Sequence, residues 1–154
     1  MVNLPSKTGS EMSEEAIKSL LERKGHGVLS MGTENRGYGV PISYHYDADH
    51  HRIVVGMVKL PGSKRSTFAS KTDEATMTVY EYHDVDTWES VIATGTLHQV
   101  RDADVPEDLA ALFFYPEGPE TDGQMVELDQ FERAWYELRI EEISGRYDGE
   151  RSPS

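Results

Sequence analysis

Two cations and several hydroxyl groups lie together in the middle of the chain, where they could bind a phosphate. The run S-K-R-S-T at residues 63–67 follows L-P-G at residues 60–62, which breaks the preceding strand pattern. Ser63 is a good N-cap, so a short helix can begin at Lys64. The first N–H groups of a helix lack internal partners and its dipole is positive there, which suits an anion. The alternative is a solvated basic turn.

The residues around this run have mostly strand patterns. Arg52–Val58 contains β-branched apolar residues and leads into the basic turn. Five other segments have alternating or β-branched patterns: 26–31, 38–46, 75–82, 88–100 and 134–143. Pro41 lies within the second of these, which indicates an edge strand, a bulge, or a place where a ligand takes the ladder position.

Three segments have helix patterns. Ser13–Lys24 has an N-cap, acidic residues in its first turn and Gly25 after its end. A short helix is expected at residues 64–69, and a third at Asp102–Tyr115, with Pro106 near its first turn. Six strands in meander order with short helices at the crossings predict a mainly β fold, a small antiparallel barrel with helices at its ends.

The charge of the chain excludes several classes of partner. The 154 residues, enough for one domain, include 15 Lys and Arg but 28 Asp and Glu, a formal net charge of -13. This acidic balance argues against nucleic acid and against an anionic membrane surface as partners, because both are bound through clustered cations. The acid excess is spread along the chain, a pattern that resembles proteins of salt-loving archaea. We expect weaker folding in low salt, where self-repulsion is poorly screened.

Several other features are excluded or expected from composition. The chain has no cysteine, so disulfides and thiolate chemistry are excluded. No apolar run approaches the ~20 residues of a membrane span, and Met1–Ser10 lacks the apolar core of a signal peptide. We therefore expect a cytoplasmic protein. The expected layout is a flexible lead at residues 1–12, one domain at 13–145 and a flexible tail at 146–154.

The histidines offer two alternative sites. His45, His50 and His51 lie with two aspartates around a hairpin turn, where polar residues are expected in any case, so no metal site is predicted. A haem-type ligand among His26, His45 or His98 stays an alternative.

The order and spacing of the segments resemble the pyridoxamine 5'-phosphate oxidase-like split-barrel family, and its small archaeal, haloarchaeal flavin-binding members in particular. The resemblance covers residues 13–145. It is carried by G-V-L-S at 27–30, Y-G-V-P-I-S-Y-H-Y-D at 38–47, P-G-S-K-R at 61–65, A-T-M-T-V-Y at 75–80, W-E-S-V-I-A-T-G-T-L at 88–97 and Y-E-L-R-I-E-E-I-S-G at 136–145. It implies a six-stranded antiparallel split β-barrel with FMN at the interface of a homodimer.

The resemblance also assigns residues to the cofactor. The segment Val40, Pro41, Ile42 and Ser43 would lie along the isoalloxazine ring and offer backbone groups to it. Val58 and Lys59 would lie near the ribityl chain and phosphate. Ser63, Lys64 and Arg65 match the phosphate-binding motif, and Ser90 falls where the family places a polar contact. A doubly charged phosphate needs such cations and N–H donors, and the ring needs an apolar slot with a few polar partners.

The C-terminus departs from the family's true oxidases. It ends G-R-Y-D-G-E-R-S-P-S and lacks both their Trp-rich segment and their Arg/His motif for pyridoxal phosphate, which argues against the vitamin B6 reaction. No catalytic side chain is identified. We expect an FMN-binding oxidoreductase or flavin reductase that acts on a small substrate, with electrons from NAD(P)H or a deazaflavin. The alternatives are a non-enzymatic flavin- or haem-binding module and a barrel that has lost its cofactor.

Overall fold

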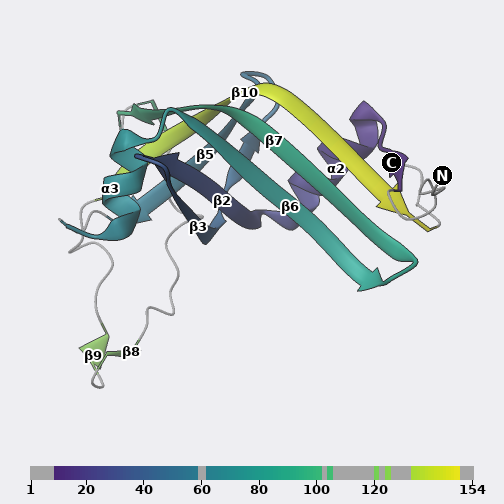
Figure 1. Ribbon diagram of the computed structural model, residues 1–154, viewed down its shortest axis with the longest axis horizontal. Coiled ribbons are helices and arrows are strands. Elements are labelled where there is room, and N and C mark those ends of the chain that lie inside the picture. The colour runs from purple at the N-terminus through teal and green to yellow at the C-terminus, as the bar shows by residue number, and fades with distance from the viewer. Residues whose placement is uncertain are drawn as a thin grey trace.

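The fold is mainly β, as the sequence predicts. The computed structural model describes residues 9–58, 62–101, 104–105, 120–121, 124–125 and 133–149 (Figure 1). Its helices are α2 (Glu14–Lys24) and α3 (Lys64–Lys71). Its strands are β1 (Ser10–Glu11), β2 (His26–Thr33), β3 (Arg36–Ser43), β4 (His45–Asp47), β5 (Arg52–Val58), β6 (Glu74–Asp84), β7 (Thr87–Val100), β8 (Glu120–Thr121), β9 (Gln124–Met125) and β10 (Arg133–Asp148).

One antiparallel sheet contains all strands except the small β8–β9 pair. Its order is β3-β2-β6-β7-β10-β5-β4, with β1 paired to β10. The predicted class, an antiparallel split barrel with short helices, is confirmed, but the meander order is wrong. The last strand, β10, lies between β7 and β5. An alternating pattern indicates which face of a strand is buried but not which strands pair with it. The order of the strands could therefore not be predicted from the pattern.

The chain crosses from one end of the sheet to the other at Tyr44. Residues 38–46 are expected as one strand, but the structure divides them into β3, which pairs with β2, and β4, which pairs with β5. The Tyr44 amide donates to the carbonyl of Gly25 (3.0 Å), and its ring is buried. The chain thus passes from the β3 end of the sheet to the β4 end within one residue.

The core lies inside the curved sheet and beneath α2. The inward side chains of α2 are Ala16, Ile17, Leu20 and Leu21. The expected helix at 13–24 is confirmed, because Ser13 caps it by accepting from the Ala16 amide (3.1 Å) and Gly25 ends it at φ 67°. The inward residues of the strands include Leu29, Val40, Ile53, Val55, Met57, Ala75, Met77, Val79, Val91, Ala93 and Leu138.

Both ends of the described chain take part in the sheet. Ser10 pairs with Tyr147 and Glu11 with Arg146, so these residues, expected in a flexible lead and tail, are strand residues here. Strand β10 also extends beyond the expected 134–143. The helix expected at 102–115 lies outside the described residues, apart from Asp104 and Val105. No helix of the described chain is long and apolar enough to cross a membrane.

A β-bulge bends β10 across the barrel. The register of β10 on β7 shifts between Ile140 and Glu142. Gly95 lies opposite, and a methyl group there would overlap the main-chain carbonyl of Arg139. Only glycine permits this close approach of the two backbones.

Candidate functional site

The predicted phosphate-binding helix is present. α3 begins after Ser63, whose side chain accepts a hydrogen bond from the Ser66 amide (3.1 Å). Lys64 is exposed and Arg65 half-buried in a first turn that contains no acidic residue. The amides of these first two helical residues have no partner within the helix. The turn can therefore present two cations and two N–H donors to an anion.

α3 packs on the hairpin of β2 and β3 through one aromatic residue. Phe68 is 3% exposed and stacks on Tyr38 of β3, with ring centroids 5.3 Å apart. The Arg36 guanidinium lies 5.9 Å from the centre of the Phe68 ring, a cation–π contact. α3 thus covers the Arg36 end of β3, and the same strand leads away from it toward Pro41.

The four residues assigned to the ring lie on this strand, but their side chains face different ways. Val40 is buried and Ile42 packs against the core. Pro41 is exposed and Ser43 half-buried on the outer face. In the described part of the chain β3 pairs with β2 alone, so it is an edge strand, as one interpretation of Pro41 predicts. Its outer edge can offer backbone groups to a ligand. The Val40 side chain is buried and cannot contact a ligand bound there.

The other predicted residues are more scattered. Val58 is half-buried at the end of β5, opposite Arg133, and Lys59 lies outside the described residues. Ser90 lies on β7 opposite Tyr80. Three strand spacings, about 14 Å, separate β7 from β3. A single chain therefore does not bring Ser90 to the residues assigned to the ring.

The outer face of the central strands carries few charged side chains, and its acidic residue Glu74 lies at the start of β6, opposite Thr96. Its residues on β2, β6 and β7 alternate with the buried ones and include Val28, Ser30, Glu74, Thr76, Thr78, Tyr80, Tyr82, Ser90, Ile92, Thr94, Thr96 and His98. Tyr80 is 57% exposed, Tyr82 60% and Ile92 47%. Exposed large apolar groups on such a face are unusual in a chain with 28 acidic residues.

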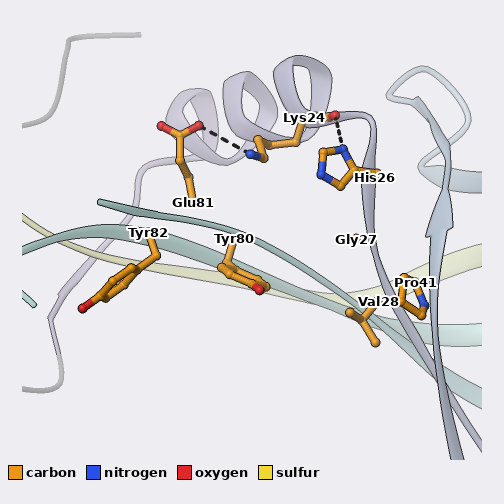
Figure 2. Close-up of a pocket in the computed structure, with 8 residues that line it drawn as sticks. All are labelled: Lys24, His26, Gly27, Val28, Pro41, Tyr80, Glu81 and Tyr82. Atoms are coloured by element: carbon orange, nitrogen blue, oxygen red, sulfur yellow. Dashed lines mark hydrogen bonds and ion pairs between the residues drawn. The ribbon is translucent and has the colours of Figure 1, made fainter. Parts of the chain in front are cut away.

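A groove of about 420 Å³ opens at the edge of this face (Figure 2). It lies where β2 leaves β6, since their pairing ends at Val28 and Thr78. Its lining residues are Lys24, His26, Gly27, Val28, Pro41, Tyr80, Glu81 and Tyr82. Apart from Pro41, and from His26 as an alternative haem ligand, none of these was predicted as a site residue. The alternating Y-E-Y at residues 80–82 was the one available signal, because it places two tyrosines on one strand face.

Charged groups of α2 and β6 meet beside the groove. Glu81 lies 3.0 Å from His83, 3.5 Å from Arg23 and 3.9 Å from Lys24. The hydrogen bond from His83, reinforced by the charges of Arg23 and Lys24, holds the pKa of Glu81 below its ordinary value. Arg23 also binds Glu89 at 3.0 Å. Glu81 is therefore an ionised carboxylate whose longest ion pair is the one to Lys24.

The histidines considered for a metal or haem lie apart. The Nδ1 of His50 binds the Asp47 carboxylate (2.9 Å), and the Nε2 of His98 binds the hydroxyl of Thr96 (2.9 Å). His45 is half-buried in β4, and His26 lines the groove. Among the described residues no group of three or more His, Cys, Asp or Glu side chains could hold a metal ion.

Solved structures of similar fold include three flavoproteins. The FAD-binding protein of Mesorhizobium loti has a TM-score of 0.68 at 16% identity, over 91% of this chain and 98% of its own. The FAD-binding protein of Mycobacterium smegmatis has a TM-score of 0.60 at 20% identity, covering 90% and 98%. The FAD- and haem-binding protein of the same organism has a TM-score of 0.64 at 15% identity, covering 96% and 76%. At these identities the likeness establishes the fold.

Sequence comparison identifies the family. A search of curated proteins gives no match. The family model for pyridoxamine 5'-phosphate oxidase matches residues 13–147, which begin at the cap of α2 and end within β10. The matched region thus contains the whole sheet apart from β1, together with both helices. The chain belongs to the pyridoxamine 5'-phosphate oxidase family.

Proposed function

We propose that this protein binds FMN and uses it as an oxidoreductase or flavin reductase on a small substrate. The observation that carries the proposal is the acid-free first turn of α3, which presents Lys64 and Arg65 in a chain of net charge -13. Membership of the family and the flavoproteins among its structural neighbours support the same cofactor class. When bound, the flavin supplies the redox chemistry.

Different residues of the chain would bind the phosphate, the ribityl chain and the ring of the flavin. Ser63 fixes the start of α3, and Lys64 and Arg65 would neutralise the phosphate with charge-assisted hydrogen bonds. The ring would lie along the free edge of β3, where Pro41 and Ser43 face outward and backbone groups are available. Val58 and Lys59 would lie between these two ends, near the ribityl chain. The side chains of Val40 and Ile42 would fix the strand from the core side.

We further propose a homodimer with the flavin at its interface. Ser90 lies too far from β3 to reach a ring bound there in the same chain, so a second copy would supply it. The exposed Ile92 on the outer face of β7 supports self-association, because contact with a second copy would cover this apolar side chain.

The absorption spectrum of the purified protein tests the cofactor. Flavin bands would support the proposal, and a colourless protein that does not take up added FMN would contradict it. A Soret band would instead favour a haem module. Bleaching of the flavin bands by NADH, NADPH or a reduced deazaflavin, followed by reoxidation with an acceptor, would support turnover. A bound flavin that none of these donors reduces would favour the non-enzymatic binder.

The acidic composition supports a place of action in concentrated salt, and we propose that the protein works in the cytoplasm of a halophilic archaeon. The 28 acidic residues are distributed over the whole length of the chain. A surface of this kind repels itself when salt is low and is screened when salt is high.

A further inference from the structure

A third cation lies beside the predicted phosphate-binding turn of α3. Arg36 is the first residue of β3 and pairs with Thr33 across the β2–β3 turn. Glu34 and Asn35 form that turn with φ values of 52° and 62°. Two successive residues with positive φ are typical of the tight two-residue turns of β-hairpins. The hairpin therefore defines the position of Arg36 at the end of the sheet.

Phe68 brings Arg36 to the first turn of α3. The Arg36 guanidinium lies over the Phe68 ring, 5.9 Å from its centre, and Tyr38 stacks on the same ring. Lys64 and Arg65 precede Phe68 by one turn of the helix. Side chains three or four positions apart are neighbours on a helix, about 5–6 Å apart between their Cβ atoms. Arg36, Lys64 and Arg65 are therefore all neighbours of one buried aromatic ring.

These three cations have no ion pair with a carboxylate among the described residues. Elsewhere in the sheet, Arg52 and Arg139 both bind Glu137, at 2.9 and 2.7 Å. Glu34 is exposed in the turn before Arg36 and does not pair with it. Like charges that are held together repel one another, and an anion bound among them removes this repulsion. The arrangement therefore favours an anion that can accept from all three cations.

We propose that Arg36 is a third phosphate-binding residue and makes the site selective for a terminal phosphate monoester. The inference rests on the proposed flavin function, in which Lys64 and Arg65 bind the phosphate. A monoester such as the phosphate of FMN has three terminal acceptor oxygens, one for each cation. Each phosphorus of the diphosphate in FAD is bridged on both sides and has only two. Arg36 therefore favours FMN over FAD.

Equilibrium dialysis of FMN, FAD and riboflavin against the full chain tests this selectivity, at about pH 8, where the phosphate of FMN is a dianion. We expect the wild type to bind FMN at least about tenfold more tightly than FAD or riboflavin. Arg36→Gln should weaken FMN binding by about ten- to a hundredfold through the loss of one charged hydrogen bond, and should change riboflavin binding by less than about twofold. Arg36→Lys keeps the charge and should recover most of the FMN affinity.

Lys18→Gln is the matched control. It removes an exposed lysine from α2, changes the net charge by the same amount and should bind FMN as the wild type does. A merely structural role of Arg36 on Phe68 predicts a different result, in which Arg36→Gln weakens FMN and riboflavin binding alike. That result would overturn the proposal.

Inorganic phosphate separates this inference from the proposed function. When phosphate replaces chloride at constant ionic strength, the melting temperature of the flavin-free chain should rise in the wild type and in Lys18→Gln, and rise less in Arg36→Gln. A chain that shows this difference but takes up no flavin would contradict the flavin function and support the phosphate site. Equal FMN affinity of the wild type and Arg36→Gln, or equal wild-type affinity for FMN and FAD, would overturn the role of Arg36 and leave the flavin proposal intact.

Discussion

The hydroxyl of Tyr44 donates a 2.7 Å hydrogen bond to the main-chain carbonyl of Leu21, and so joins the last turn of α2 to the point where the chain crosses from β3 to β4. Tyr44 is buried at the one residue that separates β3 from β4. The same residue donates its amide to the carbonyl of Gly25. Through its amide and its side chain, Tyr44 thus pairs two carbonyl groups at the end of α2 and holds the strand crossing against that helix.

Tyr44→Phe should therefore destabilise the protein. The substitution keeps the ring but leaves the Leu21 carbonyl without its donor, at a cost of about 1–2 kcal/mol in the free energy of unfolding. Urea unfolding measures this change. Tyr82→Phe removes a hydroxyl from a 60% exposed ring and is the matched control, with little expected effect. Equal stability of the two variants would refute the role of the hydrogen bond.

The pKa of Tyr44 also predicts that the folded protein loses stability at alkaline pH. Burial raises the pKa of its phenol to about 12, from an ordinary 10.0. The unfolded chain therefore ionises first, and the stabilisation is complete below about pH 10 and lost as the pH rises toward 12. This contribution to the alkaline loss of stability should disappear in Tyr44→Phe.

The ion pairs of Glu137 predict that the folded protein loses stability at acid pH. Its carboxylate is 10% exposed and binds Arg139 (2.7 Å) and Arg52 (2.9 Å). Burial alone would raise its pKa, but the hydrogen bonds from the two arginines outweigh burial and hold the pKa below its ordinary 4.5. The stabilisation is thus complete above about pH 4.5 and is lost as the pH falls through the lowered folded value.

Glu137→Gln should make unfolding less dependent on pH below 4.5, while lowering stability at pH 7 by about 1.5–3 kcal/mol through the lost charged hydrogen bonds. Denaturant unfolding at a series of pH values measures both effects. Glu142→Gln alters an exposed residue of the same strand and serves as the control. An unchanged acid profile in Glu137→Gln would show that other carboxylates control acid unfolding.

Gly95→Ala should be strongly destabilising. The added methyl would overlap the Arg139 carbonyl at the bulge, and the displacement of β10 from β7 should cost at least about 2 kcal/mol. Gly37→Ala is the control, because no atom lies within 4 Å of the position that its methyl group would take. Thermal melting of both variants compares them, and similar melting temperatures would contradict the close approach.

Lys64→Ala with Arg65→Ala should weaken FMN retention by at least about tenfold, since the phosphate would lose two charged donors. Equilibrium dialysis of FMN measures the loss. Lys71→Ala removes a cation from the last turn of the same helix and should retain FMN normally. Full retention in the double variant would refute the assignment of the phosphate to α3.

Salt should stabilise the folded state. The net charge of -13 is poorly screened in low salt, so the melting temperature should rise between dilute buffer and molar potassium chloride. Repeating the measurement with sucrose separates screening from a general solute effect. A melting temperature independent of salt would remove the proposal of a halophilic protein.

The sequence by itself determined the local elements and their caps. Ser13 and Gly25 define α2, Ser63 begins α3, and Arg52–Val58 is a strand with the predicted bounds. These features depend on residues within a few positions of one another, which propensity and capping rules can evaluate. The family resemblance, carried by the order of such segments, is confirmed for the same reason.

Only the tertiary structure decided which strands are neighbours and which surfaces meet. The insertion of β10 between β7 and β5 and the change of partner at Tyr44 are non-local pairings, which a period-two pattern leaves open. The groove joins Lys24, His26 and Tyr80 across more than fifty residues of chain. The sequence indicates Lys64 and Arg65 as candidates for binding a phosphate, while the fold places Ser90 away from β3 and brings α2 close to β6.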